Sequence, residues 1–263
     1  MATMFDFLGN PLLALALTLP RVAGAFLILP LMTQETVPAM VRNSFMVSLA
    51  IVALPVALAS SPMQAMGDAQ WPVLILKELF IGVSIGFCFG IVFWAFGAAG
   101  SVIDTQVGMS MAQIFDPIQG HQTTIHGDFL SQFAAWLFMA SGAFLVFLDL
   151  LMSSYALWPV TSFFPDLRSS GMNLFIGQFN YLGTLVLVLA APAMVLMLVI
   201  DLSFGLVNRY APQLNVFALT LPLKAWTATA VILLMIGTFA ELVLSRLLDS
   251  RGLLDVLRRT FGG

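Results

Sequence analysis

The chain has 263 residues, of which 60% are hydrophobic and 9% are charged. Soluble domains carry charge on roughly a quarter of their residues, so this composition excludes an ordinary soluble domain and indicates an integral membrane protein. The net charge of -3 gives no basic surface for nucleic acid, and the single cysteine, Cys88, excludes an internal disulfide.

Six apolar stretches follow one another, at residues 11–32, 44–60, 72–97, 129–151, 181–200 and 226–244. Most reach the roughly 20 residues that a spanning helix requires. Lipid leaves only helices or closed barrels, and these stretches lack the alternation of barrel strands. We therefore predict an all-α membrane protein with one domain over residues 1–263.

Charged residues interrupt several of these stretches. Arg21 lies in the middle of the first, Lys77 and Glu78 lie near the start of the third, and Asp149 and Asp201 lie close to the ends of the fourth and fifth. An ionised group at mid-bilayer costs about 2.5–3.5 kcal/mol and usually faces protein or water. Arg21 is therefore expected to have a partner, whereas Lys77 and the two aspartates either have partners or mark helix ends.

Gly82, Gly86 and Gly90 recur every four residues in the third stretch. They lie on one face of the predicted helix, where the absence of side chains lets another backbone approach closely. Tight helix packing is therefore expected along this face.

Residues 98–128 are too polar and too long for a tight turn, and we predict a loop there. Loops longer than about 12–15 residues in compact domains are usually functional or disordered. This one keeps apolar side chains, among them Met109, Met111 and Ile114, which a disordered segment would be expected to lack. A packed but movable loop is the better prediction, because unbranched methionines can repack against different neighbours.

His121, His126 and Asp128 form the one sequence cluster that resembles a metal or acid–base site. The spacing of the two histidines places their rings on different faces of a helix, and the chain has no further histidine. We predict no metal and no cofactor, and expect Asp128 to lie near a helix N-terminus, where the helix dipole favours it. The sequence has no phosphate-binding or nucleophile motif, so no catalytic residue is predicted.

The segment 205–217 is unusual for a loop between membrane spans. Asn208, Gln213 and Asn215 can each donate and accept hydrogen bonds, and Arg209 can only donate. A partly buried segment of this kind needs partners for many polar groups. It predicts a docking surface inside an assembly.

Basic residues give conflicting evidence on topology. Four arginines after residue 245 place the C-terminus in the cytoplasm, yet Arg209 and Lys224 flank the other end of the last stretch. Either one segment is a re-entrant hairpin, or the protein is not a simple serpentine bundle, and we favour the second. Residues 245–263 are predicted to form an amphipathic cytoplasmic tail.

Four parts of the sequence together resemble the FliR/SctT family, the single-copy subunit of the type III secretion export gate of flagella and injectisomes. They are Arg21–Gly24 with Pro30 and Pro38–Arg42, Glu78–Gly86, Asp104–Gly120, and Ala191–Pro192 with Asn208–Asn215 and Lys224. The likeness covers nearly the whole chain, and the string Asn-Arg-x-Ala-Pro-Gln-x-Asn at 208–215 is specific. Residues 138–159 look more like the injectisome branch than the flagellar one.

The resemblance implies a fold and a set of partners. Family members assemble with five SctR/FliP-type and four SctS/FliQ-type subunits into a helical cone partly raised above the inner membrane. A SctU/FlhB-type switch protein, a SctV/FlhA-type export protein and unfolded secreted substrates are further implied partners. Helical hairpins would then pack on sister subunits, and charges inside them would pair across subunit interfaces.

The resemblance also assigns roles to residues. The segment 104–120 corresponds to a plug in the central channel, with gating residues Gly108, Met109, Ser110, Met111, Ala112, Gln113 and Ile114 and with anchors Asp104, Asp116, Pro117 and Gly120. The expected subunit interfaces comprise Arg21, Arg42, Lys77, Glu78, Gly82, Gly86, Gly90, Asn208, Arg209, Pro212, Gln213, Asn215 and Lys224.

The residues alone leave two other functions open. A small secondary transporter would bind its substrate at Arg21 or Asp201 near mid-membrane, although such proteins usually contain internal repeats and no convincing repeat is found here. An intramembrane enzyme would use His121, His126 and Asp128.

Overall fold

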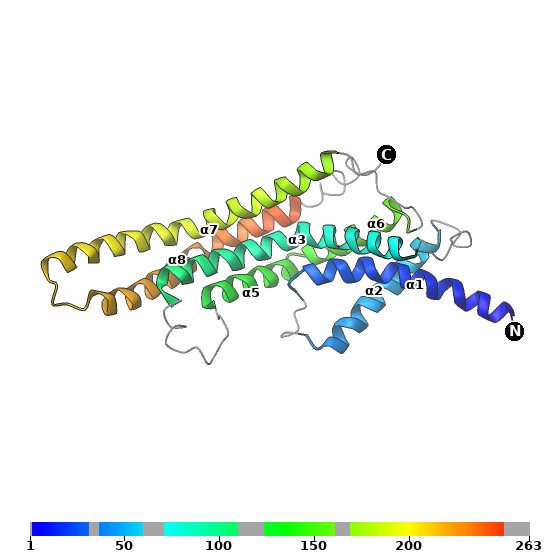
Figure 1. Cartoon of the computed structure of the whole chain (residues 1–263), viewed down its shortest axis with the longest axis horizontal. Helices are drawn as coiled ribbons and strands as arrows, with labels where there is room; N and C mark the ends of the chain where they lie inside the picture. The colour runs from blue at the N-terminus through cyan, green and yellow to red at the C-terminus, as the bar shows by residue number, and fades with distance from the viewer. Residues whose placement is uncertain (1, 32–36, 60–70, 110–123, 161–168, 250–263) are drawn as a thin grey trace. The chain divides into compact units, whose positions relative to one another are not determined.

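The computed structural model describes residues 2–31, 37–59, 71–109, 124–160 and 169–249 (Figure 1). These residues form seven helices and no strand: α1 (Ala2–Ile28), α2 (Ala39–Ala59), α3 (Trp71–Val107), α5 (Ile125–Ala140), α6 (Ala143–Leu157), α7 (Ser169–Tyr210) and α8 (Val216–Asp249). The predicted all-α membrane class is confirmed. Four helices contain stretches long and apolar enough to cross a membrane, at Ala39–Ala57, Trp71–Val107, Phe175–Tyr210 and Val216–Ser245.

The fourth predicted stretch, 129–151, is not one continuous helix. It is divided between α5 and α6, which are bent by 72° at the break between them. Gly142 lies in this break with a φ of +77°, a left-handed conformation that residues with a side chain rarely adopt. The prediction of a single helix over 129–151 is therefore wrong, because one glycine turns the chain in the middle of an apolar run.

Two breaks between helices are shorter than predicted. α3 continues to Val107 and α5 begins at Ile125, so the predicted loop 98–128 is wrong at both ends. The reason is packing, since Gly100 is helical and lets α5 approach so closely that a methyl group there would meet the backbone of Gly127. Likewise α7 continues to Tyr210, and only residues 211–215 separate it from α8.

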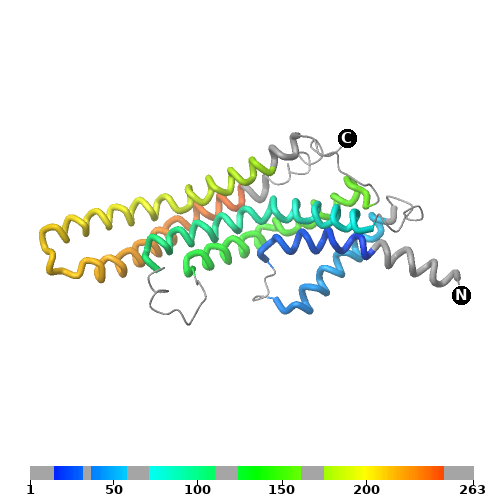
Figure 2. The backbone as a smooth tube through the Cα atoms, viewed as in Figure 1, coloured from blue at the N-terminus to red at the C-terminus, as the bar shows by residue number. Residues whose placement is uncertain are grey.

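The contacts of the chain group into two compact units, and α3 runs through both. The first unit comprises Met1–Ile91, Gly142–Gly177 and Leu247–Gly263, and the second comprises Val92–Ser141 and Gln178–Arg246. In the first unit α2 packs against α1 and α6, and α1 runs beside the N-terminal half of α3 (Figure 1). In the second unit α7 and α8 form an antiparallel hairpin (Figure 2).

Small and aromatic side chains build the core of the first unit. Ala53 and Ala57 of α2 pack in one buried cluster with Leu17 of α1. Phe26 of α1 meets the ring of Phe147 of α6 edge-on, with ring centres 5.4 Å apart, an arrangement that the aromatic quadrupole favours. Small residues on α2 therefore allow close approach to α1, while aromatic rings fill the wider space beside α6.

α1 and α3 are in backbone contact at glycines. A methyl group at Gly82 would lie against the carbonyl oxygen of Arg21, and one at Gly86 would meet the next turn of α1. Gly24 of α1 faces α3 in the same way, and Gly90 is buried. The predicted close packing is confirmed for Gly82 and Gly86, but the helix that approaches belongs to the same chain. Their assignment to a subunit interface stays a prediction.

We expect Gly82→Ala to destabilise the chain by about 1–3 kcal/mol, because an added methyl group overpacks the contact between α1 and α3. Gly237→Ala on α8 is the matched control, since nothing lies within 4 Å of that position. There the better helix propensity of alanine should raise stability by up to about 1 kcal/mol. Thermal unfolding of the detergent-purified full chain measures both variants, and equal effects would contradict the close contact.

Candidate functional site: buried charges and an exposed hairpin tip

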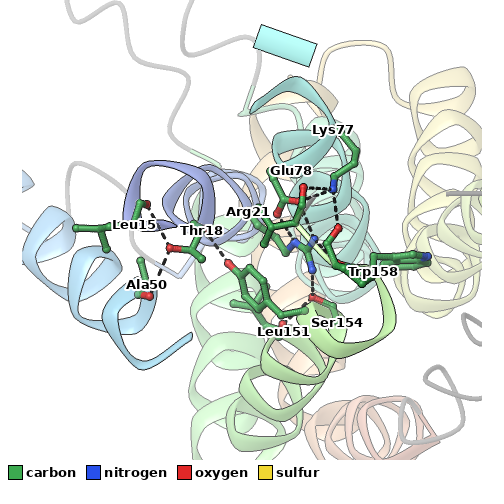
Figure 3. Close-up of polar contacts among 12 residues, drawn as sticks. Leu15, Thr18, Arg21, Ala50, Lys77, Glu78, Leu151, Ser154 and Trp158 are labelled. Atoms are coloured by element: carbon green, nitrogen blue, oxygen red, sulfur yellow. Dashed lines mark hydrogen bonds and ion pairs between the residues drawn. The ribbon is translucent and has the colours of Figure 1, made fainter. Parts of the chain in front are cut away.

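The most deeply buried charged pair joins α1 to α3 (Figure 3). Arg21 and Glu78 are both 0% exposed. The Nε atom of Arg21 lies 2.6 Å from Oε2 of Glu78, and its Nη2 atom lies 2.9 Å from Oε1. Two parallel hydrogen bonds of this kind match the planar guanidinium to the carboxylate. The expectation that Arg21 has a partner is confirmed.

Further hydrogen bonds from Arg21 hold the end of α6. Its Nη1 atom donates to the hydroxyl of Ser154 at 3.1 Å, and Nη2 also donates to the carbonyl oxygen of Trp158 at 2.9 Å (Figure 3). The guanidinium carbon lies 4.2 Å from the centre of the Tyr155 ring, a contact worth about 2 kcal/mol when it is desolvated. One arginine thus fastens α1, α3 and α6 together.

Lys77 adds a second cation at the same place. Its Nζ atom lies 2.8 Å from Oε1 of Glu78 and donates to the carbonyl oxygens of Pro159 and Val160 at 3.0 and 2.9 Å. α6 ends at Leu157. The last carbonyl groups of a helix lack partners inside it, and cations are favourable near them. Arg21 and Lys77 therefore stabilise the chain where it leaves α6.

These contacts correct one expectation from the sequence. Among the described residues, no buried side-chain nitrogen or oxygen lacks a hydrogen-bond partner. Arg21, Lys77 and Glu78 were expected to pair across subunit interfaces, but they pair with one another inside the chain. Their place at an interface stays a prediction. The fold brings together residues 57 positions apart, which spacing along the sequence does not reveal. Asp149 is exposed on α6.

A second cluster lies in the second unit, where Asp104 of α3 meets the first turn of α5. Its Oδ2 atom accepts hydrogen bonds from the backbone N–H groups of His126 at 3.0 Å and Gly127 at 3.4 Å, and Oδ1 lies 2.5 Å from Nδ1 of His126. Thr124, at the N-cap position, makes no side-chain cap bond. Asp104 therefore caps α5 from another helix, and its negative charge suits a helix N-terminus.

Asp104 was predicted to anchor a loop, and the structure places it inside α3 instead. Lys224 of α8 makes a similar contact with the last turn of α3, which ends at Val107. It is buried and donates to the carbonyl oxygen of Gln106 at 3.2 Å, and its Nζ atom lies 2.6 Å from Oδ1 of Asp201 on α7. Lys224 was expected at a subunit interface, which stays a prediction, and the partners that the structure shows are in this chain.

The tip of the hairpin formed by α7 and α8 carries exposed polar side chains, in contrast to the buried charged clusters. Asn208, Arg209, Pro212 and Gln213 are exposed in this chain. The side chains of Asn208, Arg209 and Gln213 make no hydrogen bond or ion pair with the described part of the chain. Asn215 is also exposed, and its Oδ1 atom accepts a hydrogen bond from the N–H of Ala218 at 3.3 Å, which caps α8.

Most of the predicted plug falls outside the described residues. This applies to Ser110, Met111, Ala112, Gln113, Ile114, Asp116, Pro117 and Gly120, and also to His121. Gly108 and Met109 are described and half-buried, and Gly108 ends α3 with a φ of +93°, which only glycine adopts readily. Arg42 is half-buried on α2.

Sequence reasoning missed two features of these clusters. Thr229 of α8, which lies 3.1 Å from Nε2 of His126, was not singled out, and His126 was grouped with His121 and Asp128 instead of Asp104. A signal was available, since Asp104 and His126 both lie within the predicted loop 98–128, near its two ends. Asp128 is exposed, and the described residues contain no group of three side chains that could hold a metal ion.

The fold and these contacts define an all-helical membrane protein with charges buried at helix ends and a polar hairpin tip. The chain belongs to the family of bacterial export proteins, family 1, whose profile matches residues 12–249. The prediction of the FliR/SctT family is thereby confirmed. Its relatives are type III secretion and flagellar export apparatus proteins, and the family together with the apolar helices indicates an inner-membrane protein.

Named relatives illustrate the two branches. The chain is 38% identical to the Yop proteins translocation protein T of Yersinia pestis over 232 residues, which is 88% of each chain. It is 34% identical to the secretion system apparatus protein SsaT of Salmonella typhimurium, over 81% of this chain and 83% of that one. Identity to the flagellar biosynthetic protein FliR of Bacillus subtilis is 31%, over 80% of this chain and 81% of the other. Identity is thus higher to the secretion proteins, as the resemblance of residues 138–159 suggests.

We expect Glu78→Ala to cost about 3–5 kcal/mol, because it leaves the buried Arg21 without its carboxylate. Arg21→Met should cost a similar amount, and the double variant should lose much less than the sum of the two. Thermal unfolding of the full chain measures all three. Asp149→Ala, which removes an exposed acid from α6, is the control and should stay within about 0.5 kcal/mol. Strictly additive losses would contradict the pairing.

Proposed function

We propose that the chain is the single-copy subunit of a type III protein secretion export gate, in which it forms the channel and its plug. Unfolded substrates would cross the inner membrane through this channel. The proposed partners are SctR/FliP-type and SctS/FliQ-type subunits in a ratio of five and four to one, with SctU/FlhB-type and SctV/FlhA-type proteins nearby. The proposal rests on the family and on the surface of α7.

The apolar surface of α7 is longer than a bilayer is thick. Its apolar stretch Phe175–Tyr210 has 36 residues, which extend over about 54 Å at 1.5 Å per residue. The hydrocarbon core of a membrane is about 30 Å thick. Exposed apolar side chains continue from Ile176 to Val207, and only 28% of the most apolar part is buried within the chain. Lipid alone does not cover this surface, so protein partners are needed.

The exposed hairpin tip is the second support for an assembly. Asn208, Arg209 and Gln213 offer many donors and acceptors that the described part of the chain leaves unused. They follow directly on the apolar surface of α7. A partner that covers α7 would therefore reach this tip, and hydrogen bonds there would set its orientation. Arg209, Pro212 and Gln213 remain our proposed interface residues, together with Asn208 and Asn215.

The secondary transporter is less well supported by the structure. Arg21 and Asp201, the two charges considered for substrate binding, both have partners inside the chain. A transporter would need at least one such group free to meet its substrate.

Native mass spectrometry of the full chain co-expressed with its neighbouring membrane proteins tests the assembly. We expect one copy of this chain with five of one partner and four of another. Arg209→Ala with Gln213→Ala should reduce the assembled fraction without lowering the unfolding temperature of the chain, because both side chains are exposed. Asp149→Asn is the matched exposed control. A monomer or a symmetric homodimer in the unaltered protein would overturn the proposal.

The plug is tested separately, in vesicles that contain the assembled gate. Deletion of residues 109–113 is expected to raise ion leakage, because the apolar side chains of Met109 and Met111 would no longer seal the channel. Quantification of the complex before reconstitution controls for loss of assembly. Unchanged conductance with a normal yield of complex would reject the plug while leaving the subunit assignment intact.

A further inference from the structure

The ring of His126 is held from two sides by two different helices. On one side its Nδ1 atom lies 2.5 Å from Oδ1 of Asp104 on α3. On the other side its Nε2 atom lies 3.1 Å from the hydroxyl oxygen of Thr229 on α8. The same hydroxyl also lies 3.0 Å from the carbonyl oxygen of Ala225, one turn earlier on α8. Both ring nitrogens therefore have partners, and Thr229 has two.

The number of hydrogens at these atoms limits how they can be arranged. The carboxylate of Asp104 can only accept, so Nδ1 of His126 must carry the hydrogen between them. Thr229 has a single hydroxyl hydrogen, which points either to Nε2 or to the carbonyl of Ala225. When it points to Nε2, the ring is neutral. When it points to Ala225, Nε2 must itself carry a hydrogen, and the ring is a cation.

We propose that Asp104, His126 and Thr229 form a proton-binding site in which Nε2 of His126 is the atom that takes up the proton. A hydronium ion gives its proton to the lone pair of Nε2 and leaves as water. The hydroxyl of Thr229 turns its hydrogen to the carbonyl of Ala225 and accepts from the new N–H. No other bond forms or breaks, every contact of the ring is kept, and the charge of the Asp104–His126 pair changes from negative to zero.

Asp104 is the charged side chain that contacts the ring of His126. α3 contributes that carboxylate, and α8 contributes the uncharged Thr229. Lys224, the other buried charge of α8, pairs with the exposed Asp201 of α7. Asp128, on the same helix as the ring, is exposed. Thr229 is exposed as well, so Nε2 contacts a side chain at the surface of this unit.

The site also determines where α5 begins. The carboxylate that faces the ring is the one that caps the backbone of His126 and Gly127. A change in charge of the ring therefore acts directly on the cap of α5. This inference goes beyond the proposed export function and does not depend on it.

The chain has two histidines, so His121→Gln leaves His126 as the only one. The full chain with this substitution, labelled with ¹⁵N-histidine and reconstituted in lipid vesicles, shows by ¹⁵N chemical shifts which ring nitrogen is protonated. The neutral ring is expected to carry its hydrogen on Nδ1. On acidification Nε2 should gain a proton reversibly, while Nδ1 stays protonated. A neutral ring protonated at Nε2, or a ring that never takes up a second proton, would overturn the proposal.

Two further variants test the partners of the ring. Asp104→Asn should remove the preference for Nδ1, and an unchanged preference would contradict the role of the carboxylate. Thr229→Val keeps the shape of the side chain and should speed exchange of the Nε2 proton with water about tenfold, the factor for one lost hydrogen bond to a charged group. Thr227→Val is the matched control, because its hydroxyl bonds only the carbonyl oxygen of Leu223 on its own helix. Equal exchange in the two valine variants would overturn the role of Thr229.

Discussion

The pairing of Arg21 with Glu78 is the constraint on which the first unit depends. A fully buried arginine is tolerated only when a carboxylate and further acceptors surround it, and those groups come from α3, from α6 and from Trp158 just after α6. The pair also requires α1 and α3 to lie nearly in backbone contact, and Gly24 and Gly82 make this possible. The close packing and the buried charge thus occur at the same contact between α1 and α3.

The same principle recurs wherever a helix ends inside the protein. The carbonyl groups beyond α6 receive Arg21 and Lys77, the last turn of α3 receives Lys224, and the first turn of α5 receives Asp104. Each charge has the sign that the helix dipole favours at that end. In an apolar environment water does not satisfy the free backbone groups of a helix end. Buried charges from neighbouring helices take the place of water.

The interior and the surface therefore differ from those of a soluble protein. Among the described residues, the buried charged side chains have their hydrogen-bond partners within the chain. The long apolar face of α7 and the polar tip at Arg209 and Gln213 are left for other proteins. Such a chain satisfies the backbone groups at its own helix ends, but it depends on an assembly to cover its apolar sides. This division agrees with a family of export apparatus components.

The sequence by itself determined the helical class, the membrane environment, the family and the need of Arg21 for a partner, because composition, hydrophobic length and glycine spacing are local properties of the chain. It also showed that Gly82 and Gly86 permit close packing. It did not reveal that α1 covers them, that Glu78 is the partner of Arg21, or that Asp104 caps α5 and meets His126. Those contacts were decided by the tertiary structure, because they join helices far apart in the chain through distances that spacing along the sequence does not encode.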